Sequence, residues 1–459
     1  MNIEQLKVKK TDTLKDVIHI IDINGLGIAF VVDDDEKVIG TVTDSDIRQC
    51  LIKGENISSP VETICFKHFF SLPKKFNKEN IIKTLSDDVI SRIPIKGTMR
   101  VPIIDKEGCL IDVAFISEQG LKGRLFNGKP TPKHIKTVLV VGGAGYLGSV
   151  LCKELLIKGY KVKVLDNLTY GDVGIKHLYG DENYTFIFGD MRNIQTVVSA
   201  TDDVDAVIHL AAIVGDPACS LNPEETIENN YLATKMLGEV CKYKQINRFI
   251  FASTCSVYGE SKGEKELTEK DITNPISLYA QMKLMSEEGL LELKDNNFSP
   301  TILRMGTLFG IAQRMRFDLV VNLLTIRAFK TKEFAVFGGN QWRPFLHVKD
   351  AAGAYVKMLE APIDLVGGEI FNVSHENYTI NNVGKEVYNV TGAKMNVDEQ
   401  DIDKRDYFVS TDKIKKIVNF VPSNTIANGI QEIIHEAKQG KYNDWNKPKY
   451  SNYQYLIGT

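Results

Sequence analysis

Two side chains that could carry acid–base chemistry stand four residues apart in Ser-Leu-Tyr-Ala-Gln-Met-Lys-Leu, residues 277–284. On a helix, this spacing places Tyr279 and Lys283 on one face. A tyrosine hydroxyl has an ordinary pKa near 10, and a base that works near neutral pH needs a pKa about 3 units lower, a change of about 4 kcal/mol. A neighbouring ammonium and an oxidised nicotinamide are suitable cations for that shift. Taken alone, the pair is far more typical of an ordinary helix surface than of a catalytic site.

A second group of reactive side chains follows an apolar strand. Residues 249–259 read Phe-Ile-Phe-Ala-Ser-Thr-Cys-Ser-Val-Tyr-Gly, so the strand ends in the hydroxyls of Ser253 and Thr254. In a doubly wound fold, ligands lie outside the carboxyl ends of the strands. We therefore expect these hydroxyls to face a ligand together with Tyr279 and Lys283. Read alone, they would be ordinary turn residues at the end of a strand.

A glycine-rich turn supplies the matching ligand site. Residues 137–149 read Thr-Val-Leu-Val-Val-Gly-Gly-Ala-Gly-Tyr-Leu-Gly-Ser, an apolar strand followed by Gly142, Gly145 and Gly148. These glycines allow a tight turn, a close approach of a pyrophosphate to the backbone, and close packing of the next helix on its strand. The helix over Tyr146–Tyr160 would direct its unpaired N–H groups at an anionic ligand. A purely structural glycine turn is the alternative.

An acidic residue follows the next strand, Lys161–Leu165. Asp166 stands where a carboxylate would accept hydrogen bonds from an adenosine ribose, and no Arg or Lys comes directly after it to receive a 2′-phosphate. The pattern favours NAD over NADP.

The alternation of strands and helices around these motifs predicts an α/β fold. Apolar runs favour six parallel strands: Thr137–Val141, Lys161–Leu165, Tyr184–Phe188, Ala206–Leu210, Arg248–Ala252 and Thr301–Arg304. This is a doubly wound parallel sheet of the Rossmann type. After about residue 310 the alternation loosens, and we expect a C-terminal lobe that faces the substrate.

The N-terminal part of the chain is a separate α+β unit over residues 1–119. It contains a loosely repeated pattern, with helices expected at Thr13–Ile21 and Glu79–Leu85, and strands expected at Gly27–Val32, Val38–Val42, Arg100–Ile104 and Leu110–Phe115. Residues 120–134 hold three glycines, two prolines and four cationic side chains, which is typical of a linker. The catalytic unit is then 135–459.

Composition excludes several classes of protein. The chain has 459 residues, 43% of them hydrophobic, and a net charge of −3, which gives no indication of nucleic-acid binding. Seven scattered cysteines without a CxxC or Cys/His cluster favour reduced thiols and offer no metal site. No apolar run reaches the roughly 18 residues of a membrane span, and the N-terminus lacks a signal sequence. These features indicate a cytoplasmic protein.

Residues 135–459 resemble the extended short-chain dehydrogenase/reductases, specifically the NAD-dependent nucleotide-sugar epimerase/dehydratase group. The likeness implies NAD as cofactor, a nucleotide-diphosphate sugar as substrate, and a homodimer or homotetramer. Tyr279, Lys283 and Thr254 would be catalytic, and Thr254, Arg314, Arg316 and Arg343 would contact substrate. The cofactor would meet Gly142, Gly145, Tyr146, Leu147, Gly148, Asp166, Asn167, Asp190, Met191, Leu210, Ala211, Ala212, Asn230, Ser253, Tyr279 and Lys283. As the ordinary alternative, Arg314 and Arg316 would be exposed arginines in salt bridges.

The same resemblance narrows the reaction. In the 4,6-dehydratases of this group, a carboxyl acid follows the catalytic threonine, whereas this chain has Cys255 and Ser256 there. The pattern therefore favours a 4-epimerase that works through a transient 4-keto sugar, in the synthesis of polysaccharide or glycan precursors. A 4-dehydrogenase that releases the keto sugar, a 4,6-dehydratase, and a non-catalytic NAD or nucleotide sensor are the alternatives. Retention of both Tyr279 and Lys283 argues against the sensor.

One departure from the group bears on the sugar. Many sugar 4-epimerases carry an asparagine after the Leu-Arg-aromatic run, where this chain reads Leu303-Arg-Met-Gly-Thr307. This implies a changed contact near the sugar or its diphosphate, and leaves GDP-sugars and other deoxy- or amino-sugars open beside UDP-glucose and UDP-galactose.

Residues 1–119 resemble a pair of cystathionine-β-synthase (CBS) motifs, a small module that often binds adenine nucleotides. The likeness is best in Gly40-Thr-Val-Thr-Asp-Ser-Asp-Ile-Arg48, where Thr43 and Asp46 would contact a nucleotide. The second copy lacks the matching threonine and aspartate, so one nucleotide site per pair is the most this module would hold. A module that only joins subunits is the alternative, and Asp46 would then be an ordinary helix N-terminal residue.

Overall fold

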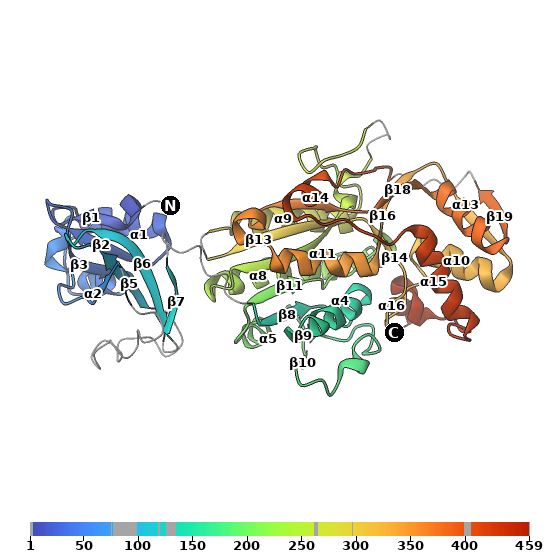
Figure 1. Ribbon diagram of the computed structural model, residues 1–459, viewed down its shortest axis with the longest axis horizontal. Coiled ribbons are helices and arrows are strands. Elements are labelled where there is room, and N and C mark those ends of the chain that lie inside the picture. The colour runs from blue at the N-terminus through green and yellow to red at the C-terminus, as the bar shows by residue number, and fades with distance from the viewer. Residues whose placement is uncertain are drawn as a thin grey trace. The chain divides into compact units, whose positions relative to one another are not determined.

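The chain forms two compact units, Met1–His134 and Ile135–Thr459. The computed structural model describes residues 3–74, 76, 99–117, 120–124, 135–260, 265–295, 297–398 and 405–458. Each unit has its own sheets (Figure 1). Each also has its own clusters of buried hydrophobic side chains.

In the part of the N-terminal unit that the structure describes, the strands form two sheets and α1 and α2 are the α-helices. The elements are β1 (Lys7–Lys9), α1 (Leu14–Asn24), β2 (Ile28–Val32), β3 (Val38–Thr43), α2 (Asp44–Ile52), β4 (Leu72–Pro73), β5 (Met99–Ile104), β6 (Leu110–Ser117) and β7 (Gly120–Arg124). Strands β1–β3 form one sheet and β4–β7 the other. The helix expected at Glu79–Leu85 lies outside the described residues.

The expected linker is corrected at its start. Residues 120–124 form strand β7, which pairs antiparallel with β6 at the edge of the second sheet. An edge strand tolerates glycines and cationic side chains because only one of its sides is paired. Residues 125–134 lie outside the described part of the chain.

The second unit is built on a seven-stranded parallel sheet. Its strands are β8 (Thr137–Val141), β9 (Lys161–Asp166), β10 (Tyr184–Phe188), β11 (Ala206–His209), β12 (Arg248–Thr254), β13 (Ser299–Met305) and β17 (Ile370–Val373). Their order is β10-β9-β8-β11-β12-β13-β17, which confirms the doubly wound fold. Strand β17 was not anticipated, because it is short and follows the segment where the alternation is lost.

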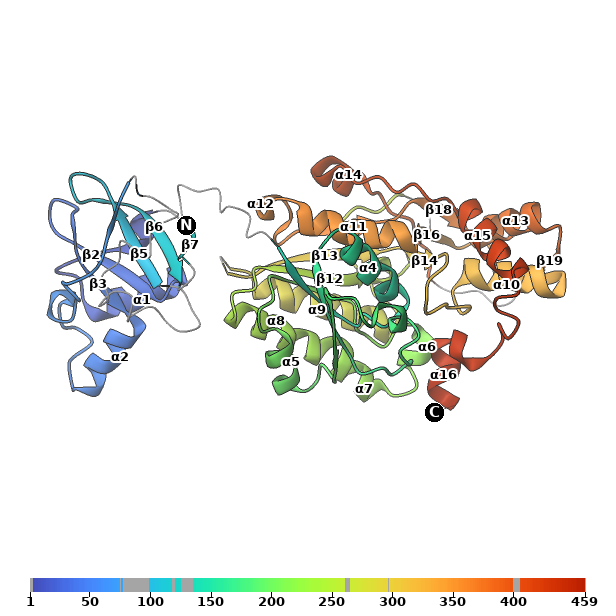
Figure 2. The same cartoon turned by 60° about the horizontal axis from the view of Figure 1, so that its bottom comes forward.

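Helices cover both faces of this sheet (Figure 2). On one face lie α4 (Tyr146–Ile157) and α11 (Val348–Glu360), whose Leu155 and Tyr355 are fully buried in one core. On the other face lie α5 (Ile194–Ala200), α8 (Ala233–Tyr243) and α9 (Leu278–Glu292), which bury Leu237 and Leu290 in a second core. Because helices pack on both faces of the sheet, the carboxyl ends of its strands lie in fixed positions along one edge.

A lobe formed mainly after residue 305 stands at that edge. It contains β14 (Thr307–Phe309), α10 (Val320–Thr331), β15 (Glu333–Phe337), β16 (Trp342–His347), β18 (Glu376–Thr379), α13 (Ile380–Thr391), β19 (Lys394–Asp398) and α15 (Ile426–Lys438). Phe309, Phe334 and Phe345 are buried in its core. The chain ends with η7 (Pro448–Tyr450) and α16 (Asn452–Gly458).

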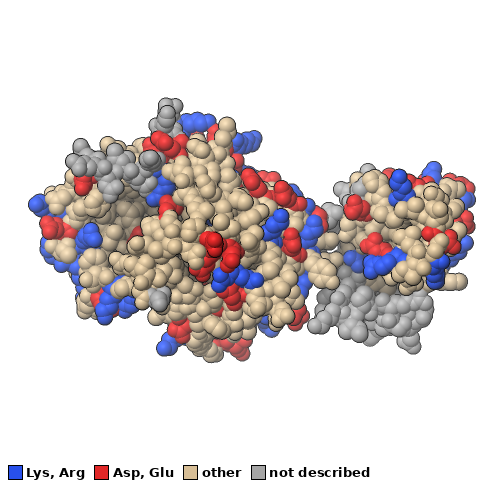
Figure 3. Space-filling view, turned by 180° about the vertical axis from the view of Figure 1, so that it is seen from behind, with Lys and Arg blue, Asp and Glu red and all other residues tan. Residues whose placement is uncertain are grey.

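The surface charges and the cysteine thiols of the structure agree with the expectations drawn from the composition. Acidic and basic side chains are interspersed on the face drawn in Figure 3. No helix among the described residues is both long and apolar enough to cross a bilayer. All seven cysteines are free thiols.

We expect the second unit to fold without the first. A protein that begins at Ile135 keeps the whole seven-stranded sheet and both of its covering helix layers. Calorimetry should show this shortened protein unfolding cooperatively, within about 5 °C of one transition of the full chain, since a change of 1 kcal/mol moves the Tm of a large domain by only about 2–4 °C. Failure of the shortened protein to unfold cooperatively would show that the N-terminal unit completes the core.

Candidate active site

One cavity of about 730 Å³ lies at the carboxyl edge of the main sheet. The ends of β8, β9, β11, β12 and β13 line it through residues such as Val141, Leu165 and Thr254. The lobe lines it through Arg327 and Arg343. This is the position at which a doubly wound sheet binds its ligands.

The glycine-rich turn forms the floor of this cavity and fits a dinucleotide. Gly142 has φ +86°, and a Cβ there would lie 2.5 Å from the backbone nitrogen of Ala211. A Cβ on Gly148 would lie 2.6 Å from the carbonyl oxygen of Gly142, so the close packing of α4 on its strand requires glycine. Among the described residues, no side chain caps α4 at Gly145. The first-turn N–H groups are therefore available to an anion such as a pyrophosphate.

Asp166 lies beside the turn at the edge of the cavity. Its carboxylate accepts hydrogen bonds from the backbone N–H groups of Ala144 at 3.0 Å and Leu168 at 2.8 Å. Burial raises the pKa of this carboxyl, and the two hydrogen bonds oppose that shift. The residue thus fixes the glycine turn as well as lining the site, and Asn167 lines the cavity next to it.

Tyr279 and Lys283 share one face of α9, as predicted, and both line the cavity. The Lys283 ammonium donates to the carbonyl oxygen of Ala252 at 2.7 Å and lies 4.6 Å from the centre of the Phe251 ring. Burial lowers the pKa of Lys283 to about 8. Helix α9 begins at an N-cap, Ser277, that accepts from the backbone N–H of Ala280, so the Tyr279 turn is locally fixed.

The pKa of Tyr279 moves opposite to the direction that the sequence led us to expect. Burial raises it above its ordinary value, and the nearby Cys219 and Asp216 add to the increase. The protein alone therefore keeps this hydroxyl protonated, and a base at this position needs additional positive charge from a ligand.

The strand-end hydroxyls form a chain across the cavity wall. Thr254 Oγ1 lies 3.1 Å from Ser256 Oγ, which lies 3.0 Å from the hydroxyl of Tyr407. Ser253 donates to the buried carboxylate of Glu287. The Cys255 thiol instead donates to the carbonyl oxygen of Arg304 and is fully buried, so it does not line the cavity.

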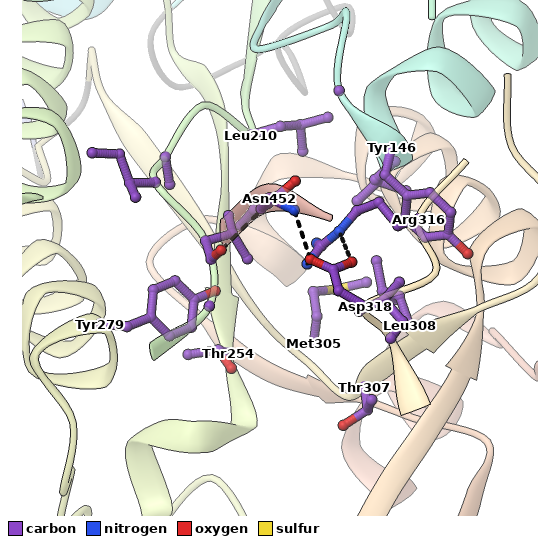
Figure 4. A pocket seen from close by; sticks show the side chains of 18 of the residues that line it. Tyr146, Leu210, Thr254, Tyr279, Met305, Thr307, Leu308, Arg316, Asp318 and Asn452 are labelled. Carbon is purple, nitrogen blue, oxygen red and sulfur yellow. Dashed lines mark hydrogen bonds and ion pairs between the residues drawn. The ribbon is translucent and has the colours of Figure 1, made fainter. Parts of the chain in front are cut away.

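Three predicted arginines line the cavity, each with a different environment. Arg316 pairs with Asp318 at 2.8 Å. Arg343 lies 5.4 Å from the Tyr407 ring and donates to the backbone carbonyl of Trp342 at 2.7 Å. Arg314 and Arg316 are buried, so the alternative that they are exposed is wrong, although Arg316 does form a salt bridge. Figure 4 shows Arg316 and Asp318 in the same pocket as Tyr279 and Thr254.

Most of the predicted cofactor residues meet in this cavity, and two do not line it. The Asp190 carboxylate pairs with Arg192 at 2.8 Å. The Asn230 side chain is fully buried and bonds both the N–H and the carbonyl of Ile213, at 2.8 and 2.9 Å. Asn230 thus braces the loop after β11, and it lies in a π-helical turn, Glu228–Leu232, that interrupts the helix.

The predicted cofactor residues that do line the cavity are Gly142, Gly145, Tyr146, Leu147, Gly148, Asp166, Asn167, Met191, Leu210, Ala211, Ala212, Ser253, Tyr279 and Lys283.

In the N-terminal unit, Thr43 and Asp46 form a capping box at the start of α2. The Thr43 hydroxyl donates to the Asp46 carboxylate at 2.6 Å, and the Asp46 N–H donates to Thr43 Oγ1 at 3.3 Å. The two side chains therefore have a structural role, whether or not a nucleotide also meets them.

Several residues of the site were not identified from the sequence. Asp216 and Arg405 form an ion pair of 3.0 Å at the cavity wall, and Tyr170, Tyr407 and Asn452 line it as well. All but Asp216 and Tyr170 come from the last 55 residues. Apart from the residue types, the sequence around these residues gives no indication of a site, because tertiary contacts bring them to the cavity.

Comparison with known proteins agrees with this geometry. The model of the "NAD dependent epimerase/dehydratase family" matches residues 138–374, and the CBS domain model matches residues 1–53. The UDP-glucose 4-epimerase of Bacillus subtilis (strain 168) is 30% identical over 285 residues, which cover 56% of this chain and 83% of that protein.

Solved structures give the same result. The UDP-glucuronic acid 4-epimerase of Bacillus cereus, in complex with UDP-glucuronic acid and NAD, is 28% identical with a TM-score of 0.60, over 66% of this chain and 99% of that chain. The UDP-glucose 4-epimerase of Thermotoga maritima, with UDP-glucose, is 25% identical with a TM-score of 0.59, over the same shares of the two chains.

The lowered pKa of Lys283 predicts a pH-dependent stability. Between a folded pKa of about 8 and the ordinary 10.5, the unfolded chain holds a proton that the folded protein lacks, so this group adds stability as pH rises. Lys283→Met should therefore unfold with a higher free energy than the parent at pH 7, by up to about 3 kcal/mol, and the difference should shrink towards pH 10. Urea unfolding of both proteins at several pH values tests this. A difference that is constant with pH would contradict it.

Proposed function

Because the chain belongs to the NAD-dependent epimerase/dehydratase family, with NAD as its cofactor, we propose that it is a nucleotide-sugar epimerase that inverts the C4 carbon through a transient 4-keto sugar. The observation that carries this proposal is the cavity in which Tyr279, Lys283 and Thr254 face the same space as the glycine-rich turn. Both named relatives above that were solved with a UDP-sugar are 4-epimerases by title.

The roles of the chain's own groups follow from their positions. NAD, when bound, supplies the hydride acceptor and donor and a positive charge near the reacting carbon. Tyr279 takes the proton of the C4 hydroxyl and later returns it, and Thr254 orients that hydroxyl by a hydrogen bond. Lys283 contributes a fixed positive charge behind the tyrosine, held by the Ala252 carbonyl.

The environment of the catalytic threonine favours epimerisation over dehydration. A dehydratase needs an acid next to that threonine to move a proton between C5 and C6. Cys255 is buried and donates to the Arg304 carbonyl, and Ser256 is bonded to Thr254 and Tyr407. Neither group is a carboxyl acid, so loss of water would lack its usual proton carrier.

The substrate is a nucleotide-diphosphate sugar, and its diphosphate would meet Arg343 and the arginines of the 314–316 segment. Polysaccharide or glycan precursor synthesis is the process we propose for it. The residues at Leu303–Thr307 keep GDP-sugars and deoxy- or amino-sugars among the substrates to be assayed. A homodimer or homotetramer, and adenine nucleotide at Thr43 and Asp46, remain predictions.

Replacing Tyr279 with Phe removes the hydroxyl and keeps the ring. NAD should remain bound, and the rate of interconversion should fall about 10²–10⁴-fold, the usual contribution of general acid–base catalysis. Steady-state rates with a panel of UDP-, GDP-, dTDP- and CDP-sugars, and the NAD content of each purified protein, provide the measurements. Activity of the variant within a few-fold of the parent would exclude Tyr279 as the base.

The product and its isotope content separate the three reactions. In deuterated water, a 4-epimerase should give the C4 epimer with no deuterium at C5 or C6, because no C–H bond at those carbons is broken and the hydride taken from C4 is returned to C4. Nuclear magnetic resonance of the product checks this. A 4-keto-6-deoxy product or label at either carbon would identify a dehydratase, and a free 4-keto sugar with one reduced cofactor per turnover would identify a dehydrogenase.

A further inference from the structure

The C-terminal end of the chain lies against the wall of the cavity. This segment, residues 442–455, is called the C-terminal strap below. The Tyr450 carbonyl accepts from the backbone N–H of Phe317 at 2.8 Å, and the two rings lie 5.1 Å apart. At its far end, Tyr455 packs edge-on against Tyr170 at 5.5 Å. The strap is therefore fixed both to the 314–318 segment and to the loop that follows Asp166.

Asn452 is the residue of the strap that reaches the cavity, and it is 3% exposed. Its side-chain oxygen accepts from Arg314 Nη2 at 2.7 Å. Its backbone N–H donates to Asp318 at 2.8 Å, and its Nδ2 donates to the carbonyl of Val214 at 3.3 Å. One side chain thus joins the arginine segment to the loop after β11. Figure 4 shows Asn452 beside Asp318 and Arg316.

Arg314 is a buried cation whose charge is not balanced locally. It is 3% exposed and lies 4.1 Å from the centre of the Tyr170 ring. The carboxylate on its own segment, Asp318, already accepts hydrogen bonds from Nε and Nη2 of Arg316. Among the described residues no carboxylate forms an ion pair with Arg314, and Asp318 and Asp166 act on its charge only from a longer distance. Burial and the neighbouring Arg316 lower the pKa of Arg314 to about 10.

A buried, unneutralised guanidinium is costly unless an anion meets it. Arg314 lines the cavity, and stacking on Tyr170 together with the bond to Asn452 leaves its planar group in one orientation. A guanidinium held in one orientation can donate two parallel hydrogen bonds to two oxygens of a phosphate.

We propose that Asn452 is a positioning residue that holds Arg314 on Tyr170 as a binding group for a nucleotide diphosphate. The diphosphate belongs either to NAD or to the nucleotide sugar, and only the second source rests on the proposed function. The strap lies outside the 138–374 segment that the family model matches, so a part of the chain beyond that segment completes the anion site.

Three variants test the proposal in the full-length holoenzyme. Asn452→Ala frees Arg314. Asn452→Asp keeps a similar shape but places a carboxylate on Arg314 and cancels its charge. Asn443→Ala is the matched control, because Asn443 lies in the same strap and only accepts from the exposed Lys330 at 2.8 Å. The measurements are NAD retention on dilution and calorimetric titration with UDP, GDP, dTDP and CDP.

We expect Asn452→Ala and Asn452→Asp each to weaken NAD or the best-bound nucleoside diphosphate about tenfold or more, as for a lost hydrogen bond to a charged group. Asn443→Ala should stay within twofold of the parent. If only NAD binding is weakened, Arg314 binds the diphosphate of the cofactor. If only binding of the nucleoside diphosphate is weakened, Arg314 binds the diphosphate of the sugar nucleotide. With an active substrate, KM should rise while kcat changes less than threefold.

Two results would overturn the proposal. The first is binding of NAD and all four diphosphates within twofold of the parent in both Asn452 variants. The second is equal weakening by Asn443→Ala, or restored binding in Asn452→Asp, since either would mean that the strap acts through folding alone. Because NAD retention needs no turnover, these outcomes are separate from a failure to find an epimerase substrate.

Discussion

A buried ion pair between Arg304 on β13 and Glu287 on α9 sets the geometry of the site. The guanidinium meets the carboxylate in a forked contact, with Nη2 to Oε2 at 2.7 Å and Nε to Oε1 at 3.1 Å. Ser253 donates to the same carboxylate. Tyr279, Lys283 and Glu287 follow one another at intervals of four on α9, so the pair fixes the helix face that carries the reactive groups. Replacing either partner alone would leave a buried charge without its counter-ion, at a cost of about 3–5 kcal/mol.

This pair also explains why the lobe and the sheet act as one site. Arg304 donates to the Tyr258 hydroxyl at 3.0 Å, and Tyr258 donates to Asn372 on the strand added to the sheet after the lobe begins. The chain thus returns from the lobe to the sheet at β17, next to β13. Rotation of the lobe against α9 is therefore limited by a buried polar network, and such networks hold a single arrangement when every member is satisfied.

The sequence predicted what is encoded locally. The strand-turn-helix of Gly142–Gly148, the six strands and the Tyr279/Lys283 face follow from periodicity and from glycine chemistry, and all were confirmed. The contacts that the sequence did not reveal join residues that are far apart in the chain. Asn230 has the residue type of a ligand contact, but its amide pairs with both backbone groups of Ile213, which no local pattern reveals. Arg405 and Asn452 reach the site because the chain folds back on the loop after β11, where they contact Asp216 and Val214.

The charges of the cavity connect binding with chemistry. In the protein alone, burial keeps Tyr279 protonated, with Asp216 and Cys219 adding to the effect. The Asp216 carboxylate is itself paired with Arg405 at 3.0 Å, and Arg316 is paired with Asp318, so these two arginines are neutralised within the protein. The cavity therefore holds a protonated tyrosine, Tyr279, and a buried guanidinium, Arg314, that has no ion-pair partner among the described residues. A ligand with a diphosphate and a positively charged ring would act on both groups. Its phosphates would neutralise the Arg314 guanidinium, and its ring would favour the phenolate form of Tyr279. In the proposed mechanism, proton abstraction by Tyr279 would therefore require that both ligands are already bound.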